Sequence, residues 1–87
     1  MVIRDWLVKL KEHLIKISME DCYMDNYDEE QIDYLIGLID GFLTGTYSLN
    51  YDTLEIFLGD IVSTAVMLVR FELLDYVKPF RSEYAEV

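Results

Sequence analysis

The residues whose side chains could bind a ligand or catalyse a reaction are concentrated in Glu20 to Tyr34, where seven of the fifteen residues are acidic and three are tyrosines. This stretch opens a longer run, Ile17 to Val69, of 53 residues with eleven Asp and Glu and no Lys, Arg or His. An acidic loop could bind calcium, and the EF-hand pattern requires oxygen ligands at positions one, three and five, glycine at six and glutamate at twelve. Counted from Asp21, positions three, six and twelve hold Tyr23, Asn26 and Ile32, which excludes this motif.

His13 and Cys22 are the other candidates for chemistry, and each is the sole residue of its type. They are too few for a zinc site, and the spacing does not group them with an orienting acid as a nucleophilic triad requires. We expect His13 on the solvent or boundary side of the first helix and Cys22 as a small, partly buried hydrophobe. Two carboxylates in a cleft could still serve a hydrolase, but no basic residue lies near them to bind an anionic substrate. No enzyme, metal or cofactor is predicted.

The composition predicts one small, acidic domain spanning residues 1–87. Hydrophobic residues make up 53% of the chain, enough for a modest core, and the net charge is -10. This charge repels nucleic acid and anionic membranes and attracts basic proteins. The most apolar run, Ile61 to Val69, has about half the length of a membrane span, and no signal peptide is visible. We expect a soluble, cytoplasmic protein.

Apolar residues recur at helical spacing in three segments, which predicts an all-α fold: a single small bundle of three to four helices. The first helix is expected over about residues 2–18, an acidic loop over 19–27 and the second helix over 28–44. Residues 51–77 are expected to form one helix, or two if Gly59 bends it and Asp60 caps the second piece. The β-branched residues around Val66 also allow a strand. Residues 82–87 are expected to fray.

Local signals mark the ends and the interior of the second helix. Asn26 and Asp28 are each followed three residues later by Glu or Gln, so either is a candidate N-cap, and Gly45 is a natural stop. Gly37 and Gly41 lie inside the helix, where each costs roughly 1 kcal/mol relative to Ala. Their presence predicts the close approach of another backbone or of a large aromatic ring.

Basic residues gather in the first helix, which carries a charge of +2 while the rest of the chain sums to -12. Two interpretations stay open. The helix either docks beside acidic helices and reduces their repulsion, or it displays a small basic patch to an acidic partner.

The acidic stretch has a partly structural explanation, because carboxylates in the first turn of a helix complement its dipole. That accounts for Asp28, Glu29 and Glu30 but not for Glu20, Asp21 and Asp25. A solubilising surface is the alternative, yet such surfaces mix both signs. Spaced carboxylates imitate a phosphate backbone and attract a basic groove, and tyrosines add contact area. We therefore predict a partner-binding surface composed of Glu20, Asp21, Tyr23, Asp25, Tyr27, Asp28, Glu29, Glu30, Asp33 and Asp40.

Residues 36–48, IGLIDGFLTGTYS, are followed by an aromatic-bearing segment with Phe57. This passage resembles the helix, FL-x-G turn and helix of small helical immunity proteins of the colicin D and contact-dependent growth inhibition type. The resemblance covers about residues 32–62, a third of the chain. It implies a helical bundle that binds a cognate nuclease toxin in the producing bacterium and fills the toxin's basic, tRNA-binding cleft with acidic residues. It assigns no individual residue.

The charge pattern and the resemblance together predict an acidic protein-binding inhibitor, an immunity protein for a nuclease toxin. One alternative is a phage-encoded nucleic-acid mimic that inhibits a restriction or CRISPR effector. Another is a helical assembly subunit whose apolar segment 51–77 continues across an oligomer interface.

Overall fold

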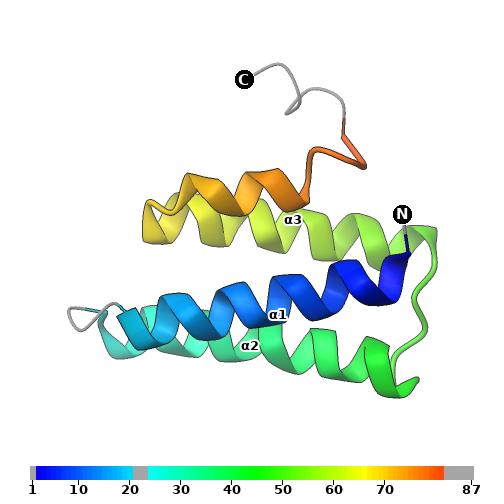
Figure 1. Ribbon diagram of the computed structural model, residues 1–87, viewed down its shortest axis with the longest axis horizontal. Coiled ribbons are helices and arrows are strands. Elements are labelled where there is room, and N and C mark those ends of the chain that lie inside the picture. The colour runs from blue at the N-terminus through cyan, green and yellow to red at the C-terminus, as the bar shows by residue number, and fades with distance from the viewer. Residues whose placement is uncertain (1, 21–23, 82–87) are drawn as a thin grey trace. The chain divides into compact units, whose positions relative to one another are not determined.

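The computed structural model describes residues 2–20 and 24–81 and builds them mainly from helices (Figure 1). The helices are α1 (Ile3–Glu20), α2 (Asn26–Thr44), α3 (Tyr51–Leu68) and the 3-10 helix η1 (Phe71–Tyr76). The predicted all-α fold with three to four helices is confirmed. No strand forms within the described residues, so the strand allowed around Val66 is wrong. The predicted fraying of residues 82–87 concerns residues outside this range.

Two compact units divide the chain, Met1–Ser48 and Leu49–Val87, and the prediction of a single domain stays a prediction. In the first unit, α1 and α2 lie side by side and antiparallel (Figure 1). The α2 helix buries Ile32, Leu35 and Ile39. The α1 helix buries five apolar residues at helical spacing: Trp6, Leu7, Leu10, Leu14 and Ile17. Burying one such aliphatic side chain contributes about 1.5–3 kcal/mol.

The α2 helix begins two residues earlier than predicted because Asp25 is its N-cap. The Asp25 carboxylate accepts a hydrogen bond of 2.8 Å from the backbone N–H of Asp28. This bond satisfies one of the N–H groups that have no partner inside a helix. The predicted caps, Asn26 and Asp28, are therefore wrong, since both lie within the helix.

The end of α2 turns back on itself. Gly45 adopts the predicted left-handed conformation with φ 80°, and the backbone N–H of Tyr47 then donates to the Gly41 carbonyl at 3.0 Å. This bond holds the Tyr47 ring against Gly41, where an added Cβ would overlap it. The predicted approach of an aromatic ring is thus confirmed at Gly41. Gly37 has nothing within 4 Å of an added Cβ, so the prediction is wrong at that residue.

In the second unit, Asn50 and Thr53 form a reciprocal capping box that starts α3. The helix passes through Gly59 without a break, and Asp60 lies inside it, so the predicted bend is wrong. A single glycine costs roughly 1 kcal/mol in a helix, which the buried face of α3 outweighs. The chain reverses after Leu68 instead, and η1 packs back on α3 (Figure 1), with Leu73 and Val77 buried.

Val69 makes this reversal in a left-handed conformation with φ 54°. The turn is a Schellman motif, because Arg70 N–H donates to the Ala65 carbonyl at 2.9 Å and Val69 N–H to the Val66 carbonyl at 3.2 Å. This conformation costs roughly 1–2 kcal/mol for an L-residue, and a β-branched side chain is an outlier in it. Burial does not offset this cost, since Val69 is 68% exposed.

Two glycines on one helix provide a matched test of the Tyr47 contact. Gly37→Ala is expected to raise the free energy of unfolding by about 0.5–1 kcal/mol, because Ala favours helix and meets no neighbour. Gly41→Ala is expected to lower it by about 1 kcal/mol, because the new methyl displaces the ring. Adding Tyr47→Ala should then recover the loss. Urea denaturation measures all three, and equal stabilisation by both Ala substitutions would contradict the contact.

Removing the strained side chain is expected to stabilise the second unit. Val69→Gly should raise the free energy of unfolding by about 1 kcal/mol, because glycine adopts a positive φ without strain. Val66→Gly is the control, since Val66 is also exposed but lies inside α3, and it should lower stability by about 1 kcal/mol. Thermal unfolding measures both variants. If Val69→Gly lowers the stability as much as Val66→Gly does, the turn at Val69 is not strained.

Candidate protein-binding surface

Most of the predicted binding residues lie on α2 or at its cap. Asp21 and Tyr23 are outside the described residues, and Glu20 is the last residue of α1. The remaining seven follow one another from the cap into the helix: Asp25, Tyr27, Asp28, Glu29, Glu30, Asp33 and Asp40. One helix and its cap therefore carry the described part of the predicted surface apart from Glu20, and the 3.6-residue repeat decides which of these side chains share a face.

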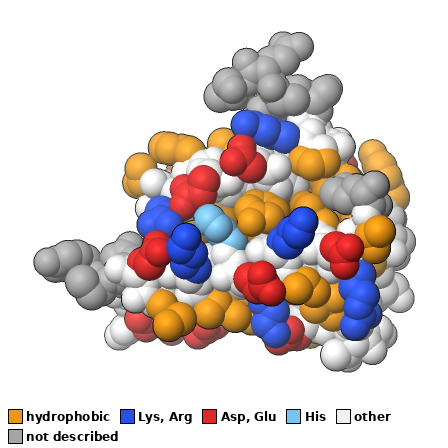
Figure 2. Space-filling model, in the orientation of Figure 1, with side chains coloured by type: hydrophobic (Ala, Val, Ile, Leu, Met, Phe, Trp, Pro, Cys, Tyr) orange, Lys and Arg blue, Asp and Glu red, His pale blue; other side chains and the backbone are white. Residues whose placement is uncertain are grey.

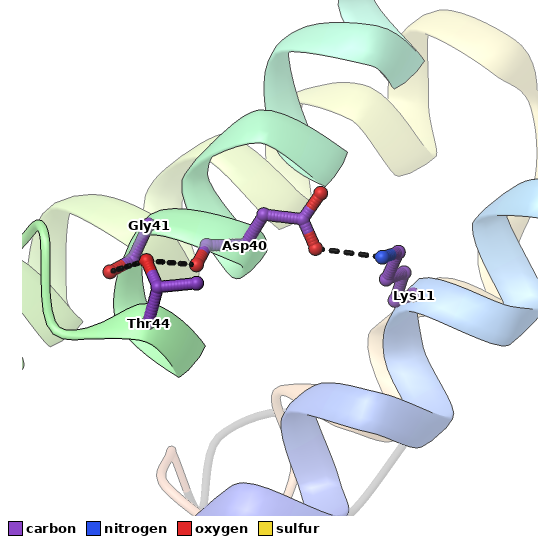
Figure 3. Close-up of polar contacts among 4 residues, drawn as sticks. All are labelled: Lys11, Asp40, Gly41 and Thr44. Atoms are coloured by element: carbon purple, nitrogen blue, oxygen red, sulfur yellow. Dashed lines mark hydrogen bonds and ion pairs between the residues drawn. The ribbon is translucent and has the colours of Figure 1, made fainter.

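Three of the predicted acids have their charge taken up by the fold. Asp25 caps α2, and the Asp40 carboxylate lies 2.6 Å from the Lys11 ammonium of α1 (Figure 3). Glu20 lies 3.8 Å from Lys16 one turn earlier in α1. Asp40, predicted to bind a partner, is therefore paired within the fold, and Asp25 has a structural role as the cap of α2 that the sequence did not reveal. Such partly exposed pairs contribute about 0–1 kcal/mol.

The Lys11–Asp40 pair also bears on the two interpretations of the basic first helix. It joins that helix to acidic α2, as the docking interpretation requires. The face of α1 seen in Figure 2 mixes Lys and Arg with Asp and Glu, so its positive charge is interspersed rather than gathered into one patch. Internal neutralisation accounts for these observations better than a displayed basic patch.

Glu29, Glu30 and Asp33 form the part of the acidic surface that has no ion pair. All three are exposed, and within the described chain none of them forms an ion pair. Asp33 lies four residues after Glu29 and three after Glu30, so the carboxylates are neighbours on the helix and repel one another by a few tenths of a kcal/mol. The fold gains little from this arrangement beyond the dipole contribution of the first turn.

Tyrosine rings accompany these carboxylates. Tyr27 is 69% exposed and Tyr34 is 49% exposed on α2, and Tyr47, held against Gly41, is 50% exposed. The Tyr47 ring also meets Phe42 edge to face, with ring centroids 6.2 Å apart. The sequence drew attention to Gly41 but did not place Tyr47 over it, because that contact depends on the turn at Gly45.

Other chemistry has little support among the described residues. His13 is half-buried on α1, as predicted for a boundary position, and Cys22 lies outside the described range. No group of three potential metal ligands comes together in that range. An open depression at the start of α1 is lined by Val2, Asp5, Trp6 and Lys9. None of the described helices has the length and apolar character needed to cross a bilayer.

Apolar side chains are also exposed in the second unit. They are Ile56, Val66 and Met67 of α3, Val69 of the turn and Phe71, the first residue of η1. Single exposed hydrophobic residues are common, whereas a concentration of them marks an interaction site.

The comparisons with known proteins leave both surfaces without a precedent. No protein family, curated protein or solved structure matches the chain. The resemblance to immunity proteins therefore stays a prediction made from residues 32–62.

The role of Asp25 as the N-cap of α2 can be tested by its effect on stability. Asp25→Ala is expected to lower the free energy of unfolding by about 1 kcal/mol, because the N–H of Asp28 loses its acceptor. Asn26→Ala should change it by less than about 0.5 kcal/mol, since Asn26 is an exposed residue inside the helix. Thermal unfolding distinguishes the two, and equal effects would contradict the cap.

Proposed function

We propose that this chain is an acidic protein-binding inhibitor, an immunity protein that neutralises a cognate nuclease toxin by occupying its basic substrate cleft. The observation that carries the proposal is the exposed, unpaired set Glu29, Glu30 and Asp33 on a helix with no cation of its own. Its role is binding in the cytoplasm of the producing cell rather than catalysis. The resemblance of residues 32–62 to immunity proteins supports the same function.

Electrostatic attraction explains how such a surface would act. An exposed helix that carries one sign of charge raises the rate of encounter with a basic cleft, and salt screens the effect. A nuclease cleft shaped for phosphates presents Lys and Arg, so carboxylates at helical spacing can occupy their positions. A phage-encoded mimic of nucleic acid that inhibits a restriction or CRISPR effector would use the same physics. A toxin gene beside this one would favour immunity, and phage genes on both sides would favour the mimic.

The charge proposal is tested by two variants with the same net charge. E29Q/E30Q/D33N removes the unpaired acids of α2, whereas D5N/E12Q/D52N removes three exposed acids elsewhere. With the cognate nuclease domain as the partner, the first variant should slow association about tenfold and flatten its salt dependence. The second should slow it less than about threefold. Stopped-flow fluorescence measures both rates, and equal effects would reject α2 as the binding surface.

Assembly through the second unit is a second candidate function, favoured by the exposed apolar side chains of α3 and the turn after it. It predicts that the sedimentation coefficient rises with protein concentration and that I56Q/V66Q abolishes the rise. Both residues are exposed, so the substitutions should leave the fold intact. A wild-type monomer at every concentration would eliminate this candidate.

A further inference from the structure

The outward face of α2 carries its tyrosine rings at regular steps. Tyr34 lies seven residues after Tyr27, and Gly41, which the Tyr47 ring covers, lies seven residues after Tyr34. Seven residues are close to two helical turns, about 10.5 Å of rise. The three rings therefore follow one side of the helix, although Tyr47 comes from the turn beyond its end.

Carboxylates and a stretch of exposed helix backbone lie between these rings. Glu30 is three residues after Tyr27 and four before Tyr34, so its side chain is a neighbour of both on the helix surface. Asp33 lies four residues before Gly37. Gly37 is exposed, and apart from its chain neighbours and the nearby backbone of its own helix no heavy atom lies within 4 Å of an added Cβ. The backbone is therefore open between the Tyr34 ring, one turn before, and the Tyr47 ring, one turn after.

Flat rings beside unpaired carboxylates match one cationic side chain better than another. A guanidinium is planar and weakly hydrated, so it can stack on an aromatic face while it donates two parallel hydrogen bonds to a carboxylate. An ammonium is compact and strongly hydrated, and it offers no flat surface. We infer that the outward face of α2, from Tyr27 to Gly41, binds arginine side chains of a basic protein segment. The inference rests on the proposed function and specifies how it is performed.

Charge complementarity selects this occupant over others. The run from Ile17 to Val69 contains no Lys, Arg or His, so no cation within it competes for Glu30 or Asp33. Lys11 reaches α2 from the other helix and is already paired with Asp40 (Figure 3). A second copy of this chain would bring the same acidic face and be repelled, and anionic lipid or nucleic acid would be repelled as well.

Synthetic peptides can test the arginine preference without the natural partner. Nona-arginine and nona-lysine carry equal charge, and each is titrated into the full isotopically labelled chain at low ionic strength. We expect nona-arginine to bind about tenfold more tightly. Its binding should shift the amide signals of residues 27–41, including Gly37 and Gly41.

Substitutions on the same face identify the source of the preference. Tyr27→Leu and Tyr34→Leu should each reduce the arginine preference about threefold, whereas Tyr27→Phe and Tyr34→Phe keep a ring and should retain it. Tyr51→Leu, which removes an exposed ring from α3, should leave it unchanged. E30Q/D33N should weaken the binding of both peptides. Two independent ring positions keep the test valid if one variant misfolds.

The outcomes separate this inference from the function on which it rests. Equal affinity for both peptides on α2 would overturn the arginine preference and leave an acidic inhibitor of a basic protein intact. Amide shifts confined to the second unit would overturn α2 as the binding face. If neither peptide shifts any amide at low ionic strength, both the inference and the proposed function fail.

Discussion

Carboxylates on one helix repel each other, and α2 carries five of them between Asp28 and Asp40 without a Lys or Arg in its own sequence. The fold reduces this repulsion at the two ends. The first-turn acids, with the cap at Asp25, lie at the positive end of the helix dipole, and Lys11 of α1 neutralises Asp40 near the other end. Glu29 and Glu30 belong to this first turn or adjoin it. Asp33, in the middle, receives neither form of compensation within the described residues.

Burial outweighs the remaining repulsion. Ile32, Leu35 and Ile39 of α2 are buried, and each contributes about 1.5–3 kcal/mol, whereas a like-charge pair on a helix costs a few tenths. The helix can therefore keep exposed acids that do not stabilise it. The turn at Gly45 adds a second feature, because it returns Tyr47 to Gly41 and places a third ring on the same side. One helix thus presents both charge and aromatic surface to a partner.

Periodicity predicted α1 and α2 to within two residues at each end, since the spacing of apolar residues sets the type of the element. The N-cap of α2 was not predictable in the same way, because Asp25, Asn26 and Asp28 all carry suitable oxygens and the choice depends on which backbone N–H is left without a partner. The bend expected at Gly59 was wrong for a related reason. Helix propensity identifies Gly59 as an unfavourable residue inside a helix. The packing of Leu73 and Val77 instead places the reversal at Val69, a residue type that rarely adopts a positive φ.

The candidate binding surface was also predictable only in part. Sequence identified the acidic, tyrosine-rich stretch, and most of its described residues do lie on one helix. It could not separate Asp40 from Asp33, because the difference is an ion pair to a lysine 29 residues away in the chain. Nor could it place the Tyr47 ring over Gly41, since this contact forms only after the chain turns at Gly45. The predicted binding surface is thereby reduced to the side of α2 whose carboxylates form no ion pair.

The central claim is that α2 meets a basic partner. Amide hydrogen exchange of the chain, with and without a nuclease domain that co-purifies with it, tests it most directly. The account predicts slowed exchange over residues 26–44 in the complex and little change over residues 51–68. Protection confined to residues 51–68, or no protection anywhere, would contradict it.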